Sequence, residues 1–328
     1  MRRTALAIAL VLLAALPFWV GNAYYTNIAA QILIYAIFAL GLNVVVGYAG
    51  LVSLGHAALF GVAAYAGAVL VNAGQGHLVV VLGSCGVTIS VAAIFAVLAL
   101  RGTGLGFVMI TVALGQIVWG VAYRWISVTN GDNGVSITAR PSPFGLSLAT
   151  APAFYWAVFV VFLAAVGSMA VFVGSPFGAS LRGTRDQPRR MTALGYNVWL
   201  IRFLAFLLSG FWSGVAGLLY LYYNQFISPQ AVALTASAEV LLMVISGGTA
   251  TLLGPIAGAA LVVIIKNVAS AYIERWNFVL GAIFVAIVIF MPEGLVPGTV
   301  RLWRWTAAEL RSRGAARTAE AAPRERTP

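Results

Sequence analysis

The sequence predicts an all-α, polytopic membrane protein. Of its 328 residues, 62% are hydrophobic and only 8% are charged, whereas soluble domains carry about 25% charged residues. Apolar stretches close to the length that crosses a hydrocarbon core, about 20 residues, follow one another along the chain. The 35 glycines suit close helix packing and helix breaks in lipid. We therefore expect one membrane domain over residues 1–300 and a tail over 301–328.

The apolar stretches give the expected helices in order. Candidate spans lie near residues 5–21, 28–48, 54–72, 78–99, 106–124, 153–173, 203–223 and 276–291. The first resembles a signal peptide, but Trp19 and Asn22 stand where a cleavage site needs small residues, so an uncleaved helix is expected. Two shorter segments, 237–249 and 251–268, form either two complete helices or a re-entrant pair. The chain then crosses the membrane about eight to ten times.

The distribution of basic residues predicts that both termini are cytoplasmic. With the N-terminus inside, 15 of the 19 lysines and arginines fall on the inner side, and only Arg124, Arg140, Lys266 and Arg275 fall outside. The net charge of +11 follows from this asymmetry and from a basic tail near anionic lipid, so it requires no nucleic-acid partner. The composition of the tail predicts that it is partly disordered.

A polar, arginine-rich segment over residues 175–202 interrupts the apolar pattern on the cytoplasmic side. Pro188 favours the first turn of a helix, and Gly195 is a plausible helix stop, so a two-turn helix is expected from Pro188 to Leu194. A helix this short is unstable alone, and it must rest on the membrane domain or on a partner. An ordinary basic loop is the alternative interpretation.

Two glycine-rich stretches, 41–61 and 247–258, place small polar residues between apolar flanks. Broken helices persist at membrane depth only where protein or a water-filled cavity covers their backbone, and transporters often bind substrate there. Glu239 is an acid within the apolar core of a span, where acids are usually partnered or functional. The alternatives are that the glycines only allow close packing, that His56 is a packing residue, and that Glu239 bonds a neighbouring helix.

The sequence offers no residue set for catalysis. The apolar segments contain no Ser/His/Asp set, no carboxylate pair, no HExxH motif and no phosphate-binding GxxxxGK[ST] loop. The single cysteine, Cys85, excludes an intrachain disulfide and a cysteine-based metal site. We therefore expect a protein that is not an enzyme and binds no cofactor or metal. If transport uses ATP, the ATPase is another chain.

Five ordered segments over about residues 30–297 resemble the LivM-type permeases of bacterial branched-chain amino-acid ABC transporters. They are GLNVVVGYAGLVSLGHAALFGVAAYAGA (41–68), TNGDNGV (129–135), ALGYNVWLIRFLAFLLSGFWSGVAGLLY (193–220), SPQ with SAEVLLMVISGGTATLLGPIAGAAL (228–230 and 237–261), and FMPEGLVP (290–297). The resemblance implies the ABC importer permease fold and a bacterial inner-membrane location.

The resemblance also implies that residues 182–195 form the helix that docks on an ATPase. The residues expected to couple the two proteins are Arg182, Asp186, Met191, Ala193, Leu194 and Gly195. This chain departs from the family over 186–190, where DQPRR replaces a more acidic, alanine-rich segment. The charge of the docking segment is therefore shifted toward positive.

The implied partners are a LivH-type second permease, two ABC ATPase subunits and a periplasmic or extracellular substrate-binding protein. The implied mechanism is alternating access for branched-chain amino acids, with urea or amides as alternative substrates. A passive channel or a proton-coupled carrier using Glu239 is a further alternative. Depth and polarity give the substrate-pathway candidates, which are Asn43, Ser53, His56, Glu239, Thr249 and Thr251.

Overall fold

The structure is a computed structural model, and it describes residues 17, 22–138, 148, 150–272, 276–291 and 294–298. The longer helices are α2 (Ala23–Asn43), α3 (His56–Asn72), α4 (His77–Ala99), α5 (Leu105–Arg124), α7 (Ala151–Gly174), α10 (Val198–Asn224), α11 (Leu234–Gly247), α12 (Gly254–Tyr272) and α13 (Trp276–Phe290). Apart from residue 17, the predicted first span lies outside the described residues, as do the tail, Arg140 and Arg275.

Short elements join these helices. They are the π-helix η1 (Val44–Tyr48), α6 (Ile126–Thr129), the 3-10 helix η2 (Gly131–Asn133), β1 (Val135–Ser136), α8 (Pro176–Asp186), α9 (Pro188–Ala193), β2 (Phe226–Ile227) and the 3-10 helix η4 (Pro229–Val232). Strands β1 and β2 pair antiparallel, with Val135 opposite Ile227. This two-stranded contact ties the connection after α5 to the end of α10.

The all-α, multi-pass prediction is confirmed. Among the described residues, five helices are long and apolar enough to cross a membrane: residues 23–48, which combine α2 and η1, and α4, α5, α7 and α10. Helix α11 has 14 residues and therefore rises about 21 Å, less than the roughly 30 Å of a hydrocarbon core. The predicted break near residue 250 is thus present, between α11 and α12.

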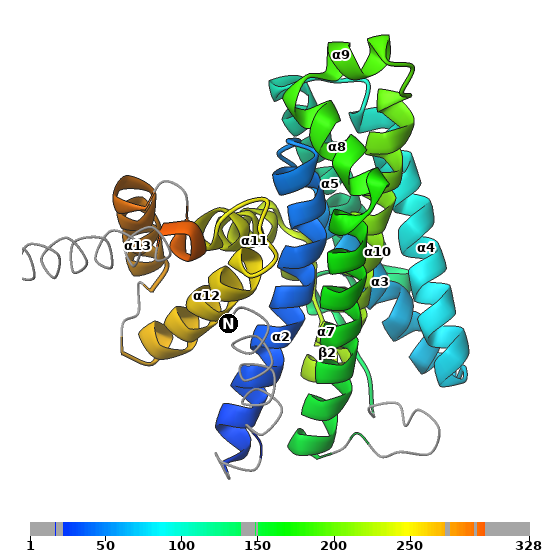
Figure 1. The fold of residues 1–328 in the computed structure, drawn as a ribbon. Coiled ribbons are helices and arrows are strands. Elements are labelled where there is room, and N and C mark those ends of the chain that lie inside the picture. The colour runs from blue at the N-terminus through cyan, green and yellow to red at the C-terminus, as the bar shows by residue number, and fades with distance from the viewer. Residues whose placement is uncertain are drawn as a thin grey trace, which may run out of the picture.

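Helix α2 is the centre of the molecule. It packs against α7 and α10 on one side and against α11 and α12 on the other, as its position in Figure 1 shows. From Leu33 onward nearly every α2 side chain is buried, although the sequence has no amphipathic period. A helix that is apolar all round is expected to be enclosed by other helices, and α2 fulfils this expectation.

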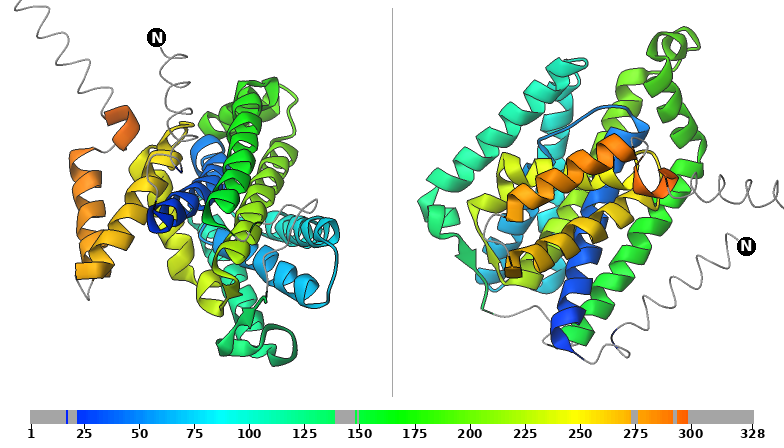
Figure 2. Two further views of the ribbon diagram at one scale, coloured as in Figure 1. Left: turned by 90° about the horizontal axis from the view of Figure 1, so that it is seen from below. Right: turned by 90° about the vertical axis from the view of Figure 1, so that its left-hand side faces the viewer.

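Helices α3 and α4 pack against α10, and α5 packs against α3 and α4. Helices α11, α12 and α13 pack on one another beside α2. Figure 2 shows α12 and α13 crossing the face that is turned to the viewer in its right panel. Helices α8 and α9 project at one end of the bundle, whereas β2 lies toward the other end (Figure 1). The polar segment that contains α8 and α9 therefore lies at one end of the helical bundle and not along its sides.

Candidate functional site

The predicted docking segment contains two helices rather than one. The Ser175 hydroxyl accepts a hydrogen bond from the Gly178 N–H at 3.2 Å, and Pro176 follows at the first helical position, so α8 begins there. Helix α8 was not predicted from the sequence, although this serine–proline pair is the local signal for its start. Helix α9 then begins at Pro188 as expected, but it ends at Ala193, with Leu194 as its C-cap.

The predicted helix stop at Gly195 is confirmed by its geometry. Gly195 has φ of +86°, its N–H donates to the Thr192 carbonyl, and the Tyr196 N–H donates to the Met191 carbonyl at 3.1 Å. This pattern is the Schellman motif, which satisfies the last carbonyls of a helix. The chain therefore turns sharply at Gly195, between α9 and α10.

The six predicted coupling residues form a protruding unit. Arg182 and Asp186 lie on α8, Met191 and Ala193 lie on α9, and Leu194 and Gly195 follow. Helix α9 has no buried residue, and Leu194 is 65% exposed. Tyr196, two residues further on, is 46% exposed. Neighbouring exposed apolar side chains beside arginines are typical of a surface that binds a protein partner.

Two arginines attach α8 to the membrane helices. The Arg185 guanidinium donates to the Gly47 carbonyl in η1 at 2.5 Å, and the Arg202 guanidinium of α10 donates to the Thr184 carbonyl of α8 at 2.6 Å. Arg185 and Asp186 also lie 3.9 Å apart, but both are exposed, so this ion pair contributes little. A displacement of α8 would therefore act directly on η1 and on α10.

Asn43 connects α2 to the break between α11 and α12. Its Oδ1 accepts from the Ala250 N–H at 3.0 Å, and its Nδ2 donates to the Thr251 carbonyl at 2.9 Å. A Cβ atom at Gly47 would collide with the same Asn43 oxygen and with the Ala250 nitrogen. Only glycine at position 47 allows η1 and residues 248–253 to approach this closely.

The threonines of this break differ in their surroundings. The Thr251 hydroxyl donates to the Gly248 carbonyl at 2.8 Å and accepts from the Gly254 N–H at 3.0 Å, so it organises the start of α12. Thr249 is exposed. Of these two pathway candidates, Thr249 is the one that presents its side chain to the surroundings of the molecule.

His56 and Ser53 lie in a buried hydrogen-bond chain. The His56 Nδ1 atom lies 2.7 Å from the Ser53 hydroxyl, and its Nε2 atom lies 2.8 Å from the Ser209 hydroxyl. Because Ser209 donates its proton to the Gly41 carbonyl at 2.6 Å, it must accept from His56 Nε2–H. His56 is 1% exposed and Ser53 is fully buried. Through this chain of hydrogen bonds, His56 and Ser53 help to connect α2, α3 and α10.

Glu239 forms an ion pair with Lys266. Its carboxylate oxygens lie 3.1 and 3.4 Å from the Lys266 ammonium nitrogen. Helix α12 continues past Lys266 to Tyr272, so the Glu239 carboxylate balances the Lys266 charge between two helices, whereas the count of basic residues placed Lys266 on the outer side. The sequence contained a signal for this ion pair, because Lys266 is its only lysine and lies in an apolar run.

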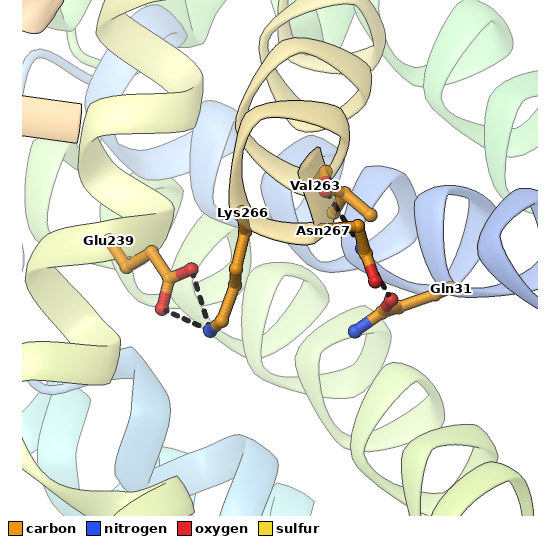
Figure 3. A network of polar contacts seen from close by, with 5 residues as sticks. All are labelled: Gln31, Glu239, Val263, Lys266 and Asn267. Carbon is orange, nitrogen blue, oxygen red and sulfur yellow. Dashed lines mark hydrogen bonds and ion pairs between the residues drawn. The ribbon is translucent and has the colours of Figure 1, made fainter. Parts of the chain in front are cut away.

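An amide pair lies beside this ion pair, as Figure 3 shows. The Asn267 Nδ2 atom donates to Gln31 Oε1 at 3.2 Å and to the Val263 carbonyl at 2.8 Å. Side chains from α2, α11 and α12 thus meet in a patch that we call the polar cluster: Gln31, Glu239, Lys266 and Asn267. The Lys266 side chain is 32% exposed and the Glu239 side chain is 19% exposed.

This architecture is that of a multi-pass helical membrane protein, with a polar projection at one end and a broken helix pair, α11 and α12, packed against the central helix α2. The family model described as branched-chain amino acid transport system, permease component, matches residues 24–288. The chain therefore belongs to this family.

Named relatives agree with the family. The chain is 31% identical to the high-affinity branched-chain amino acid transport system permease protein LivM of Escherichia coli strain K12, over 88% of this chain and 74% of the relative. It is 30% identical to LivM of Salmonella typhimurium over the same shares. It is 23% identical to the permease protein LivH of Escherichia coli strain K12, over 80% of this chain and 91% of the relative. No solved structure matches the chain.

Proposed function

We propose that this chain is the LivM-type half of an ATP-driven importer of branched-chain amino acids. The observation that carries the proposal is the exposed α8–α9 projection, which combines an arginine-rich surface with the exposed Leu194, on a chain of this permease family. A LivH-type permease completes the pathway, two ABC ATPases drive it, and a periplasmic or extracellular protein delivers substrate. The likeness of this chain to both LivM and LivH supports a pair of homologous halves.

In this proposal α8 and α9 face the cytoplasm, because the arginines of residues 175–202 lie on the inner side by the positive-inside rule. The ATPases bind α9 and Leu194, and closure of the ATPase dimer displaces the projection. Arg185 passes this displacement to Gly47, and Asn43 passes it from the end of α2 to Ala250 and Thr251. The broken segment that lines the pathway then changes position together with α2.

The proposal is tested with the complete transporter in proteoliposomes. The wild-type complex is expected to accumulate leucine only with ATP and loaded binding protein. Leu194→Glu places a charge on the docking surface, and we expect it to lower uptake by at least about tenfold while the chain remains folded. Leu194→Met is the matched control and retains uptake. Unchanged uptake by Leu194→Glu would contradict the docking role.

The same assay separates the alternatives. Leucine flux through vesicles that contain this chain without ATPases would indicate a channel or a carrier, and such flux would overturn the proposal. ATP-dependent uptake of urea or an amide, with no uptake of leucine, would retain the importer mechanism and replace the substrate.

A further inference from the structure

We propose that the polar cluster is a recognition site for the zwitterionic head of a free α-amino acid on the translocation pathway. Lys266 would bind the substrate carboxylate and Glu239 would bind the substrate ammonium group, with Gln31 and Asn267 completing the hydrogen bonds. This inference rests on the proposed function, since it assigns the substrate class to one place in the permease.

The position of the cluster carries the first step. Glu239 lies within α11, Lys266 within α12 and Gln31 within α2, all inside apolar segments. Charged side chains within membrane helices face the protein interior or a water-filled path, because contact with lipid is costly. Yet Lys266 keeps 32% and Glu239 keeps 19% of its side chain exposed. This face of α11 and α12 is therefore turned toward a polar path.

The chemistry of the cluster carries the second step. An α-amino acid presents an ammonium group and a carboxylate on one carbon, and the cluster presents the same two charges as a pair. When substrate enters, Glu239 exchanges the Lys266 ammonium group for the substrate ammonium group. Lys266 exchanges the Glu239 carboxylate for the substrate carboxylate, so neither protein charge is left unpaired. This exchange avoids the large penalty of breaking a buried ion pair. A neutral substrate such as urea offers no such exchange.

The surroundings suit the rest of an aliphatic amino acid. Tyr35 lies one helical turn after Gln31 on α2, and its ring meets that of Tyr220 edge to face, with centroids 6.3 Å apart. The asparagine amide of Asn267 is already held by Gln31 and by the Val263 carbonyl. Charged and amide groups thus lie on the same helices as aromatic side chains, and small-molecule sites combine apolar surface with a few orienting polar groups.

The test compares single substitutions with a charge exchange in the complete transporter. Glu239→Gln and Lys266→Gln are each expected to lower leucine uptake by at least about tenfold, with the complex still assembled. The double variant Glu239→Lys with Lys266→Glu restores an ion pair but reverses its direction, so we expect uptake to stay low. Ser90→Ala, on an exposed face of α4, is the matched control and transports at the wild-type rate.

Each outcome decides the question. Recovery of uptake in the charge exchange, to within about twofold of wild type, would show that the ion pair is structural or contacts the second permease, and would overturn the inference. Wild-type uptake by both single variants would overturn it as well. If the charge-exchange complex does not assemble, equilibrium leucine binding to the assembled Glu239→Gln complex decides, with wild-type affinity as the contradicting result. A wild-type complex that does not transport leucine refutes the proposed function itself, and the inference with it.

Discussion

Arg185 shows how one side chain joins the projection to the membrane helices. Its guanidinium bonds the Gly47 carbonyl, and its aliphatic stem lies against Gly50, where a Cβ atom would lie 2.8 Å from the Arg185 Cγ. Glycine at position 50 therefore makes room for the arginine stem. Through Gly47 the contact reaches the residues that hold the break between α11 and α12.

Replacing Arg185 with glutamine is expected to separate ATP hydrolysis from transport. The shorter amide cannot reach the Gly47 carbonyl while α8 keeps its place, so movement of α8 is passed on less completely. We expect leucine uptake per ATP hydrolysed to fall about tenfold, measured in proteoliposomes, while hydrolysis itself persists. Arg101→Gln, an exposed arginine between α4 and α5, is the control. An unchanged ratio of uptake to hydrolysis would refute this transmission.

Asn43 holds its position by two hydrogen bonds to backbone that lies more than 200 residues away in sequence. Asn43→Ala leaves the Ala250 N–H and the Thr251 carbonyl without these partners, at an expected cost of about 1–3 kcal/mol in unfolding free energy. The measurement is the thermal unfolding midpoint of the purified chain in detergent. Asn72→Ala removes one exposed hydrogen bond to the Ser136 carbonyl and is expected to cost less than about 1 kcal/mol. Equal midpoints for the two variants would contradict the structural role of Asn43.

At the scale of elements, glycines decide how closely the helices approach. Gly217 of α10 faces the backbone of α3, and a Cβ atom there would collide with the Phe60 carbonyl oxygen. Gly167 of α7 has no atom within 4 Å of the corresponding point. The two glycines look alike in the sequence, and only the first is required by packing.

Gly217→Ala should therefore push α10 away from α3 and lower the unfolding free energy by about 1–3 kcal/mol. Gly167→Ala provides the matched comparison on an open helix face, and its thermal midpoint should not fall. Both midpoints can be read from intrinsic fluorescence in detergent. If the two substitutions lower the midpoint equally, the close contact of α3 and α10 is not what requires glycine at position 217.

For the whole molecule, the proposed orientation places α9 in the cytoplasm and the η2–β1 segment outside. In a Cys85→Ala background, Arg189→Cys should react with a membrane-impermeant maleimide only in inverted vesicles. Asn133→Cys should react only in right-side-out vesicles or whole cells. Both residues are exposed. Helix α9 precedes the start of α10, whereas η2 is followed by β1, which pairs with β2 just after the end of α10. Labelling of both cysteines from the same side would overturn the topology.

The sequence by itself determined the class of the protein and the order of its described spans. The reason is that the hydrocarbon core demands long apolar segments, so hydropathy alone marks helices such as α4, α7 and α10. The stop at Gly195 was also determined locally, because a Schellman motif needs φ above zero. The conformation of a residue could be predicted in this way where its contacts are made within its own turn of the chain.

Only the tertiary structure decided which polar residues meet. Nothing local pairs Glu239 with Lys266, Asn43 with Ala250, or Arg185 with Gly47, because each contact joins different elements, at separations of 27, 207 and 138 residues. Helix packing sets these approaches, and it is governed by side-chain volumes across the whole bundle. For the same reason His56, a pathway candidate by depth and polarity, lies buried between two serines, whereas Lys266, assigned to the outer side, lies beside Glu239 in the polar cluster.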